Sequence, residues 1–245
     1  MIKNYFANDY EGPAFELFGE GHLVALAIIA AIITWLIVGW RNPSEVAKRR
    51  GRYVLFGAIL VVQIVYFSWL FTTGAWDVRE NLPLHVCSFS IYGSMYVLAT
   101  RSYRVYEVIF FFGIVGAAQA VLTPSVGEYG LPHFRAVQTL VAHGLIIIAL
   151  VYMTVIEGFR PTFASVWKSL LALNLLMVPV TGVNLLLGSN YMFTLAKPAT
   201  ASLFDLLGPW PWYLLATEFV ALGLFLLLYL PFIFSRDKKQ SDSVS

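Results

Sequence analysis

Seven apolar segments, each long enough to cross a bilayer as a helix, constrain the fold of this chain more than any other feature. The hydrocarbon core of a bilayer is about 30 Å thick and a helix rises about 1.5 Å per residue, so one crossing needs roughly 20 apolar residues. The predicted spans lie near residues 22–40, 53–72, 83–99, 107–122, 135–156, 166–187 and 212–234. We therefore expect an all-α, polytopic membrane protein in which residues 1–235 form a single seven-helix transmembrane domain.

The composition excludes other classes of protein. Of the 245 residues, 59% are hydrophobic and 12% are charged, whereas about a quarter of a soluble domain is charged. These values are typical neither of a soluble globular protein nor of a disordered chain. The net charge of +2 is small and gives no reason to expect a nucleic acid as a partner.

The distribution of basic residues predicts the orientation in the membrane. Residues 41–52, 100–106, 157–168 and the tail after residue 234 hold twelve of the sixteen Lys and Arg residues. The segments expected on the other side hold only Lys3, Arg79, Arg135 and Lys197. By the positive-inside rule, we expect the N-terminus outside the cell and the C-terminus, with a polar tail at 236–245, in the cytoplasm.

One loop is unusual in composition. Residues 188–213 contain too many prolines for one helix and too many aromatic residues for a free linker. We expect this segment to lie at the membrane surface as a cap. Trp210 and Trp212 suit the headgroup level, where an indole ring is half buried and still forms hydrogen bonds.

Neither a metal nor a cofactor is indicated. The chain has one cysteine, Cys87, so it forms no internal disulfide. Its four histidines, at positions 22, 85, 133 and 143, do not have the spacing of zinc ligands.

Polar residues inside the predicted spans are the candidates for function, because each is costly in hydrocarbon and needs a partner or a purpose. Most of them fall in the outer half of the bilayer, which suggests a polar chamber between helices that opens outward. The candidates are Gln63, His85, Cys87, Gln119, His143, Asn174, Thr181, Asn184 and Glu218.

A thiol and an imidazole in such a chamber favour acyl transfer through a thioester. Cys87 would attack an ester carbonyl, and a base on another helix would move the proton, with His143 as the natural candidate. His85 is less suitable, because residues two apart on a helix diverge by about 200°. Gln119 or Asn184 would donate hydrogen bonds to the oxyanion.

Each of these residues also has a structural alternative. A lone cysteine is often a small hydrophobic residue, and His143 would also serve as an interhelical hydrogen-bonding group. Gln119 lies among small residues that favour close helix packing. Glu218 would orient a histidine, carry a proton or act as a structural acceptor.

Four stretches resemble a known family. They are NLPLHVCSFSIYG (81–93), QAVLTP (119–124), LPHFRAVQTLVAHG (131–144) and, most specifically, GSNYMFTLAKPATASLFDLLGPWPWYLL (188–215). They resemble the YwaF-type family of bacterial integral membrane proteins, which is similar to a eukaryotic transmembrane cysteine acyltransferase that acts on lyso-ether-phospholipids.

The resemblance implies a multi-pass protein of the bacterial inner (plasma) membrane, with a membrane phospholipid or lysophospholipid as its partner. It also implies a Cys nucleophile on the third span and a His on a later one, which fall on Cys87 and His143. The residues expected to bind or orient the substrate are His85, Gln119, Asn184, Asn190, Tyr191 and Glu218.

Three functions from different classes remain open. The first is a phospholipid acyltransferase of the Cys/His type. The second is a small-molecule or proton-coupled carrier that uses Glu218 and His143, although the halves of the chain show no convincing repeat. The third is a non-enzymatic binding or assembly protein, in which the polar residues hold helices together.

Overall fold

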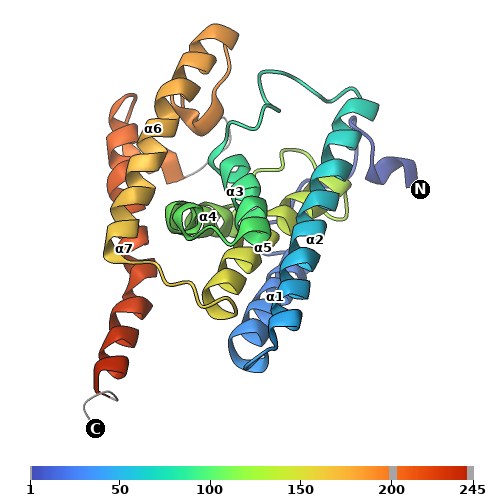
Figure 1. Cartoon of the computed structure of the whole chain (residues 1–245). Coiled ribbons are helices and arrows are strands. Elements are labelled where there is room, and N and C mark those ends of the chain that lie inside the picture. The colour runs from blue at the N-terminus through green and yellow to red at the C-terminus, as the bar shows by residue number, and fades with distance from the viewer. Residues whose placement is uncertain (1, 199–202, 242–245) are drawn as a thin grey trace.

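The computed structural model describes residues 2–198 and 203–241, and this part of the chain contains seven α-helices and no β-strand (Figure 1). The expected all-α class is therefore confirmed. The first helix continues into a short π-helical segment, Trp35–Gly39. The α-helices are α1 (Glu20–Thr34), α2 (Glu45–Thr72), α3 (Val86–Thr100), α4 (Tyr103–Leu122), α5 (Phe134–Val155), α6 (Phe163–Leu187) and α7 (Trp212–Ser241).

Six of the helical segments within the described residues are long and apolar enough to cross a membrane, counting α1 with its π-helical continuation. The protein is thus a multi-pass membrane protein. The exception is α3, which has 15 residues and begins at Val86, not near residue 83 as the sequence predicted. The helix starts there because its N-cap residue, His85, has extended backbone geometry.

Other helices extend beyond their predicted apolar spans. The helix α2 begins at Glu45, well before residue 53, because the Ser44 hydroxyl caps it by accepting a hydrogen bond from the Ala47 amide. The helix α7 continues to Ser241, past the end of its apolar part at Ile233. The predicted polar tail at 236–245 is therefore helical at first, and its last four residues lie outside the described part.

The helices α4 and α5 form the centre of the bundle. The helix α4 packs against α3, α5, α6 and α7, and α5 also packs against α1, α2 and α3. In Figure 1, α4 is seen nearly along its axis whereas α2 and α7 are seen from the side, so α4 is strongly inclined to them. Their crossing buries aromatic and aliphatic side chains such as Tyr106, Phe111 and Leu150.

One end of the bundle carries most of the described basic residues, and we call it the basic end. It contains the chain segments 40–44, 101–102 and 156–162. Here the buried Glu157 carboxylate pairs with Arg52 of α2 at 3.0 Å and with Arg101, which follows α3, at 2.8 Å. A second buried carboxylate, Glu107 of α4, pairs with Lys168 of α6 at 2.7 Å. Acidic residues therefore hold the basic ends of several helices together.

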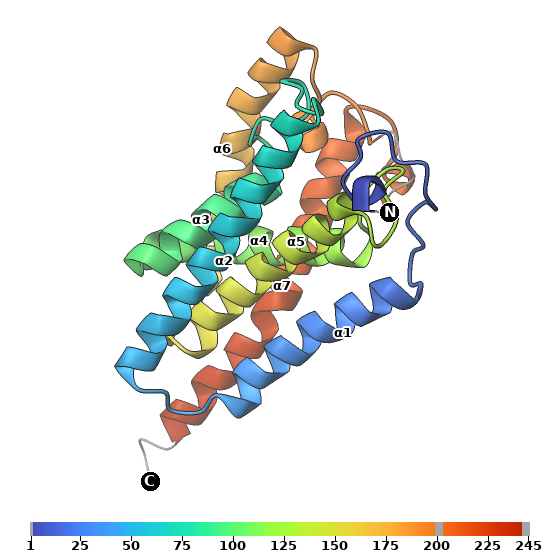
Figure 2. The same ribbon diagram turned by 90° about the vertical axis from the view of Figure 1, so that its right-hand side faces the viewer.

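The opposite end, which we call the loop end, contains residues 73–85, 123–133, 188–198 and 203–211. The N- and C-termini lie near opposite ends of the bundle in both ribbon views (Figures 1 and 2). The N-terminal segment 6–14, called the strap below, lies against the start of α5. His133 Nε2 bonds to the Ala7 carbonyl at 3.0 Å, and the Trp69 indole donates to the Phe6 carbonyl at 2.8 Å.

Candidate functional site

Cys87 lies in the first turn of α3, at the loop end of the bundle, and its side chain is half buried. His85 is the N-cap residue of this helix, but its side chain does not cap the helix. The amides of Val86 and Cys87 have no backbone acceptor within the described residues, whereas those of Ser88 and Phe89 bond to the His85 carbonyl. The thiol therefore lies beside amides that can donate hydrogen bonds to a developing negative charge.

His143 lies in the middle of α5 and is also half buried. Its Nδ1 bonds to the backbone carbonyl of Thr139 at 2.7 Å. A carbonyl oxygen accepts only, so Nδ1 carries the proton and Nε2 of the neutral ring keeps its lone pair. The helix thus fixes His143 in the tautomer that a general base requires.

The helices that carry Cys87 and His143 both contact α4 at Gly113. A Cβ atom added at Gly113 would lie 2.8 Å from Leu150 of α5 and 3.5 Å from the Ser90 hydroxyl of α3. Counted by helix rise toward the loop end, Cys87 is about 4.5 Å beyond Ser90 and His143 about 10.5 Å beyond Leu150. Cys87 and His143 therefore both lie on the loop-end side of this contact.

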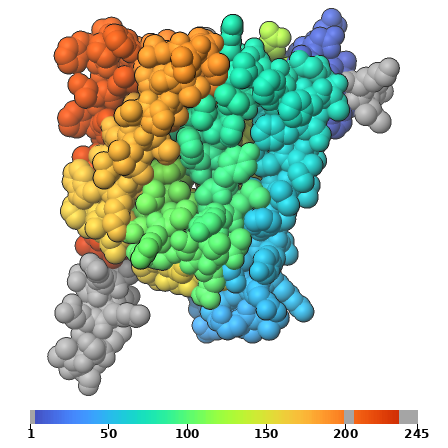
Figure 3. Space-filling view, turned by 45° about the horizontal axis from the view of Figure 1, so that its top comes forward, coloured from blue at the N-terminus to red at the C-terminus, as the bar shows by residue number. Residues whose placement is uncertain are grey.

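The loop that follows α6 packs on the residues that precede α3. The Tyr191 hydroxyl donates to the Val78 carbonyl at 2.7 Å and accepts from the Leu82 amide at 2.9 Å. His85 Nδ1 accepts from the Met192 amide at 3.3 Å, and its ring packs edge-on against that of Tyr191. In Figure 3 the end of α6 and its following residues lie directly against the segment after α2. We call residues 78–85 and 184–196, which these bonds join, the loop cluster. It covers the start of α3, where Cys87 lies.

Asn184 and Asn190 hold the loop cluster in shape. Asn184 is fully buried, and its side chain donates to the Tyr191 carbonyl and the Thr194 hydroxyl. The same side chain accepts from the Ser189 hydroxyl and the Tyr191 amide. Asn190 bonds through its side chain to the backbone of residues 195 and 196. Four of the predicted site residues, His85, Asn184, Asn190 and Tyr191, are thus brought together at the loop end.

Gln119 and Glu218 lie outside this cluster. The Gln119 side chain is exposed near the end of α4 and has no hydrogen-bond partner among the described residues. Glu218 of α7 accepts a hydrogen bond of 3.0 Å from the exposed Asn174 of α6. This pair joins two helices that also pack on each other.

No metal site is formed by the residues that the structure describes, because no three His, Cys, Asp or Glu side chains gather there as metal ligands would. The chemistry available at the start of α3 is that of a thiol, an imidazole and backbone amides.

Comparison with known families gives one match. Residues 17–229, from the segment before α1 to most of α7, match the TMEM164 family. The chain belongs to this family. The matched region includes Cys87, His143 and the whole loop cluster, and membership is compatible with a membrane protein that modifies lipids. No curated protein and no solved structure matches the chain.

Several residues important to the site in this TMEM164 family member were missed by sequence reasoning. Thr139 orients His143 through its backbone carbonyl, and the Val86 amide is available because α3 starts there. Backbone groups carry no sequence signal of their own. The ion pairs of Glu107 and Glu157 at the basic end were also not predicted, because apolar runs and basic residues alone do not indicate which carboxylate a helix end will meet.

Proposed function

We propose that this protein transfers acyl chains between phospholipids through a thioester on Cys87, with His143 as the base. We further propose that it is a YwaF-type member of the family in the bacterial inner membrane, with its N-terminus outside and its C-terminus in the cytoplasm. In that orientation the loop end, where Cys87 lies, faces outward, and we propose that a polar chamber beside Cys87 opens toward the outer leaflet.

The observation that carries this proposal is the fixed tautomer of His143. In the first step, the Cys87 sulfur forms a bond to the acyl carbonyl carbon as its proton passes to Nε2 of His143. The ester C–O bond breaks, and the leaving lysophospholipid alcohol takes that proton. In the second step, the hydroxyl of the acceptor lipid gives its proton to Nε2 and attacks the thioester, and the Cys87 thiol is regenerated.

The amides of Val86 and Cys87 are better placed to stabilise the oxyanion than the Asn184 side chain. Asn184 already uses both donors and both acceptors of its side chain within the loop cluster. The free amides in the first turn of a helix point out of its N-terminal end. They are therefore already oriented when negative charge develops on the substrate oxygen. We assign His85, Asn184, Asn190 and Tyr191 to positioning the loop over the start of α3.

The proposed reaction requires the Cys87 thiol and the His143 ring to come close together. A base must come within about 3 Å of the proton that it removes, directly or through one water molecule. We propose that the bound lipid brings the two groups together, either by moving α3 or by ordering a water between them.

The proposal is tested by the intact mass of the purified protein after incubation with a phospholipid donor and no acceptor. We expect an acyl-sized addition that neutral hydroxylamine removes and that Cys87→Ser never acquires. His143→Gln should retain the fold and acquire the addition at least about a hundredfold more slowly, the usual cost of losing a general base. Acyl transfer at the wild-type rate by Cys87→Ser would contradict the proposal.

A proton-coupled carrier is the second candidate, and one observation favours it. The Glu218 carboxylate bonds to Asn174 between two apolar helices, where an ionisable residue commonly marks a proton pathway. This function does not need a thiol. The same mass measurement separates the two candidates, because a carrier would show no hydroxylamine-sensitive addition.

A further inference from the structure

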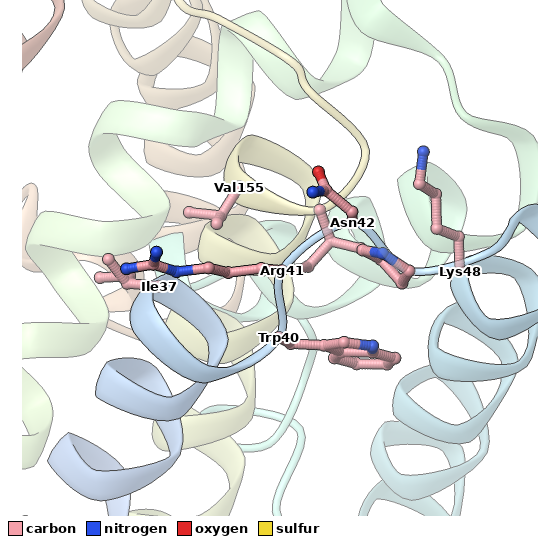
Figure 4. A pocket seen from close by; sticks show the side chains of 8 residues that line it. Ile37, Trp40, Arg41, Asn42, Lys48 and Val155 are labelled. Carbon is pink, nitrogen blue, oxygen red and sulfur yellow. The ribbon is translucent and has the colours of Figure 1, made fainter.

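A pocket at the basic end belongs to neither the Cys87 site nor the loop cluster. It lies between the π-helical end of the first helix, the 40–44 turn, the start of α2 and the end of α5, and its volume is about 500 Å³. Figure 4 shows the guanidinium of Arg41 beside Ile37, and the side chains of Asn42 and Lys48 above the ring of Trp40. The pocket therefore combines a cationic rim with an apolar wall.

The charge of the pocket is positive. Arg41 and Lys48 are cationic, and none of the residues that line it is acidic. The Arg41 Nε donates to the Val38 carbonyl at 3.0 Å, which orients the guanidinium, and its terminal nitrogens have no partner among the described residues. Lys48 pairs with Glu45 at 2.7 Å, but the Glu45 side chain is mostly exposed and can exchange for a ligand anion.

The apolar wall indicates that the ligand is not a free anion. Ile37 and Val155 line the pocket, and Trp40 stacks on Trp35 and meets Tyr152 edge-on. These residues lie where the apolar spans end, which is the level at which the glycerol and the first acyl carbons of a phospholipid lie. A ligand that satisfies both parts of the pocket needs a phosphate joined to an apolar body.

We propose that this pocket binds the headgroup phosphate of an anionic phospholipid. Arg41 provides a forked donor to the phosphate oxygens, and Lys48, whose ammonium lies on the other side of the pocket in Figure 4, adds positive charge to its rim. Asn42 lies at a left-handed φ of 50° in the turn and offers an amide to the phosphate or the glycerol oxygens. The bound lipid would stabilise the junction of the first helix, α2 and α5.

The proposal is tested by native mass spectrometry of the full chain in detergent, with phosphatidylglycerol and phosphatidylcholine of the same acyl length present in equal amounts. We expect wild type to retain phosphatidylglycerol at least about tenfold better. The double variant Arg41→Gln with Lys48→Gln should lose this preference. No preference in wild type would overturn the proposal.

The matched control is Arg49→Gln with Arg50→Gln, which removes the same charge from exposed residues that do not line the pocket. We expect this control to keep the preference within about twofold. An equal loss in both double variants would show attraction to surface charge in general and would overturn the site. Cys87→Ser should keep the preference, so the result is independent of the acyl-transfer proposal.

A competition arm distinguishes a lipid from a free phosphate. A short-chain phosphatidylglycerol and inorganic phosphate are added at the same concentration to the protein–lipid complex. We expect only the short-chain lipid to displace the bound phosphatidylglycerol. Equal displacement by inorganic phosphate would show that the apolar wall contributes nothing and that the pocket is not a lipid site.

Discussion

At the scale of single residues, Asn184 shows how far a polar side chain inside a span can be committed to structure. The sequence predicts it as a site residue because an amide is costly in hydrocarbon. In the structure, all four of its hydrogen-bonding positions are used by residues 189–194 and it is fully buried. Its effect on the site is therefore exerted through Tyr191 and the loop cluster.

Asn184→Ala is expected to lower the free energy of unfolding by about 2–4 kcal/mol, because it leaves several buried donors and acceptors without partners. Thermal or denaturant unfolding in detergent measures the change. Asn190→Ala is the matched control, since two of its three side-chain bonds in the same loop are exposed and the third is half-buried, and the expected cost is under about 1 kcal/mol. Equal effects of the two substitutions would contradict the role assigned to Asn184.

At the scale of elements, the strap 6–14 depends on one neutral histidine. His133 Nδ1 accepts from the Arg135 amide at 3.1 Å, so Nε2 carries the proton that is donated to the Ala7 carbonyl. The ring also stacks on Tyr129, whose hydroxyl bonds to Asn8. A second proton on His133 would remove the acceptor at Nδ1 and weaken this arrangement.

The strap is expected to loosen in mild acid. Burial lowers the pKa of His133 below its ordinary value of 6.5, and the charge of Arg135 lowers it further, against the opposing effect of the bond to Ala7. The unfolded chain thus binds more protons than the folded one just below pH 6.5. The stability that His133 contributes is complete above that pH and falls as the pH is lowered toward the shifted pKa. Hydrogen exchange of residues 5–15 between pH 8 and pH 5 measures the effect after correction for intrinsic rates.

The control for this prediction is His133→Gln. A glutamine side chain has one acceptor for the Arg135 amide and one donor for the Ala7 carbonyl, but it does not titrate. We expect the variant to lose the change in protection between pH 8 and pH 5. The same pH dependence in the variant would assign the effect to another group.

At the scale of the whole molecule, the basic end is held by ion pairs that join helices distant in sequence. Glu157 pairs with residues of α2 and of the α3–α4 connection, and Arg52 also donates to the Leu98 carbonyl of α3. Three parts of the bundle therefore meet at one buried carboxylate.

Glu157→Gln is expected to lower the free energy of unfolding by about 3 kcal/mol, because it leaves the buried Arg52 without a compensating charge. Denaturant unfolding in detergent measures the change. Glu45→Gln removes the exposed pair with Lys48 and should leave the unfolding midpoint nearly unchanged. A midpoint for Glu157→Gln equal to that of Glu45→Gln would show that the buried pairs contribute little.

The fold could be predicted from the sequence to the extent that apolar runs determine it. Each predicted span overlaps one helix, because a run of about 20 apolar residues has few alternatives to a membrane helix. The limits of α2 and α3 could not be read in this way. The start of α2 depends on a hydroxyl cap at Ser44, and the start of α3 depends on the extended backbone geometry of His85. Neither feature can be read from the hydropathy of the segment.

The candidate site could be predicted less well. The energetic cost of polar side chains in hydrocarbon identified Cys87 and His143 as candidates in the sequence. Their roles stay predictions. The contact of His85 with Met192 joins residues 107 apart in sequence, so no local pattern reveals it. The tautomer of His143 depends on a backbone carbonyl, which every residue has.

The helix α3, which carries Cys87, is shorter than the hydrocarbon layer of the membrane is thick. Its 15 residues extend about 22 Å, whereas the 28 residues of α2 extend about 42 Å and the hydrocarbon layer measures about 30 Å. Irregular backbone at membrane depth is tolerated only where protein covers it, and the residues around Tyr191 provide that cover. A change in bilayer thickness alters the mismatch of α3 as well as that of the longer helices, so we expect the acyl-chain length of the surrounding lipids to affect the surroundings of Cys87.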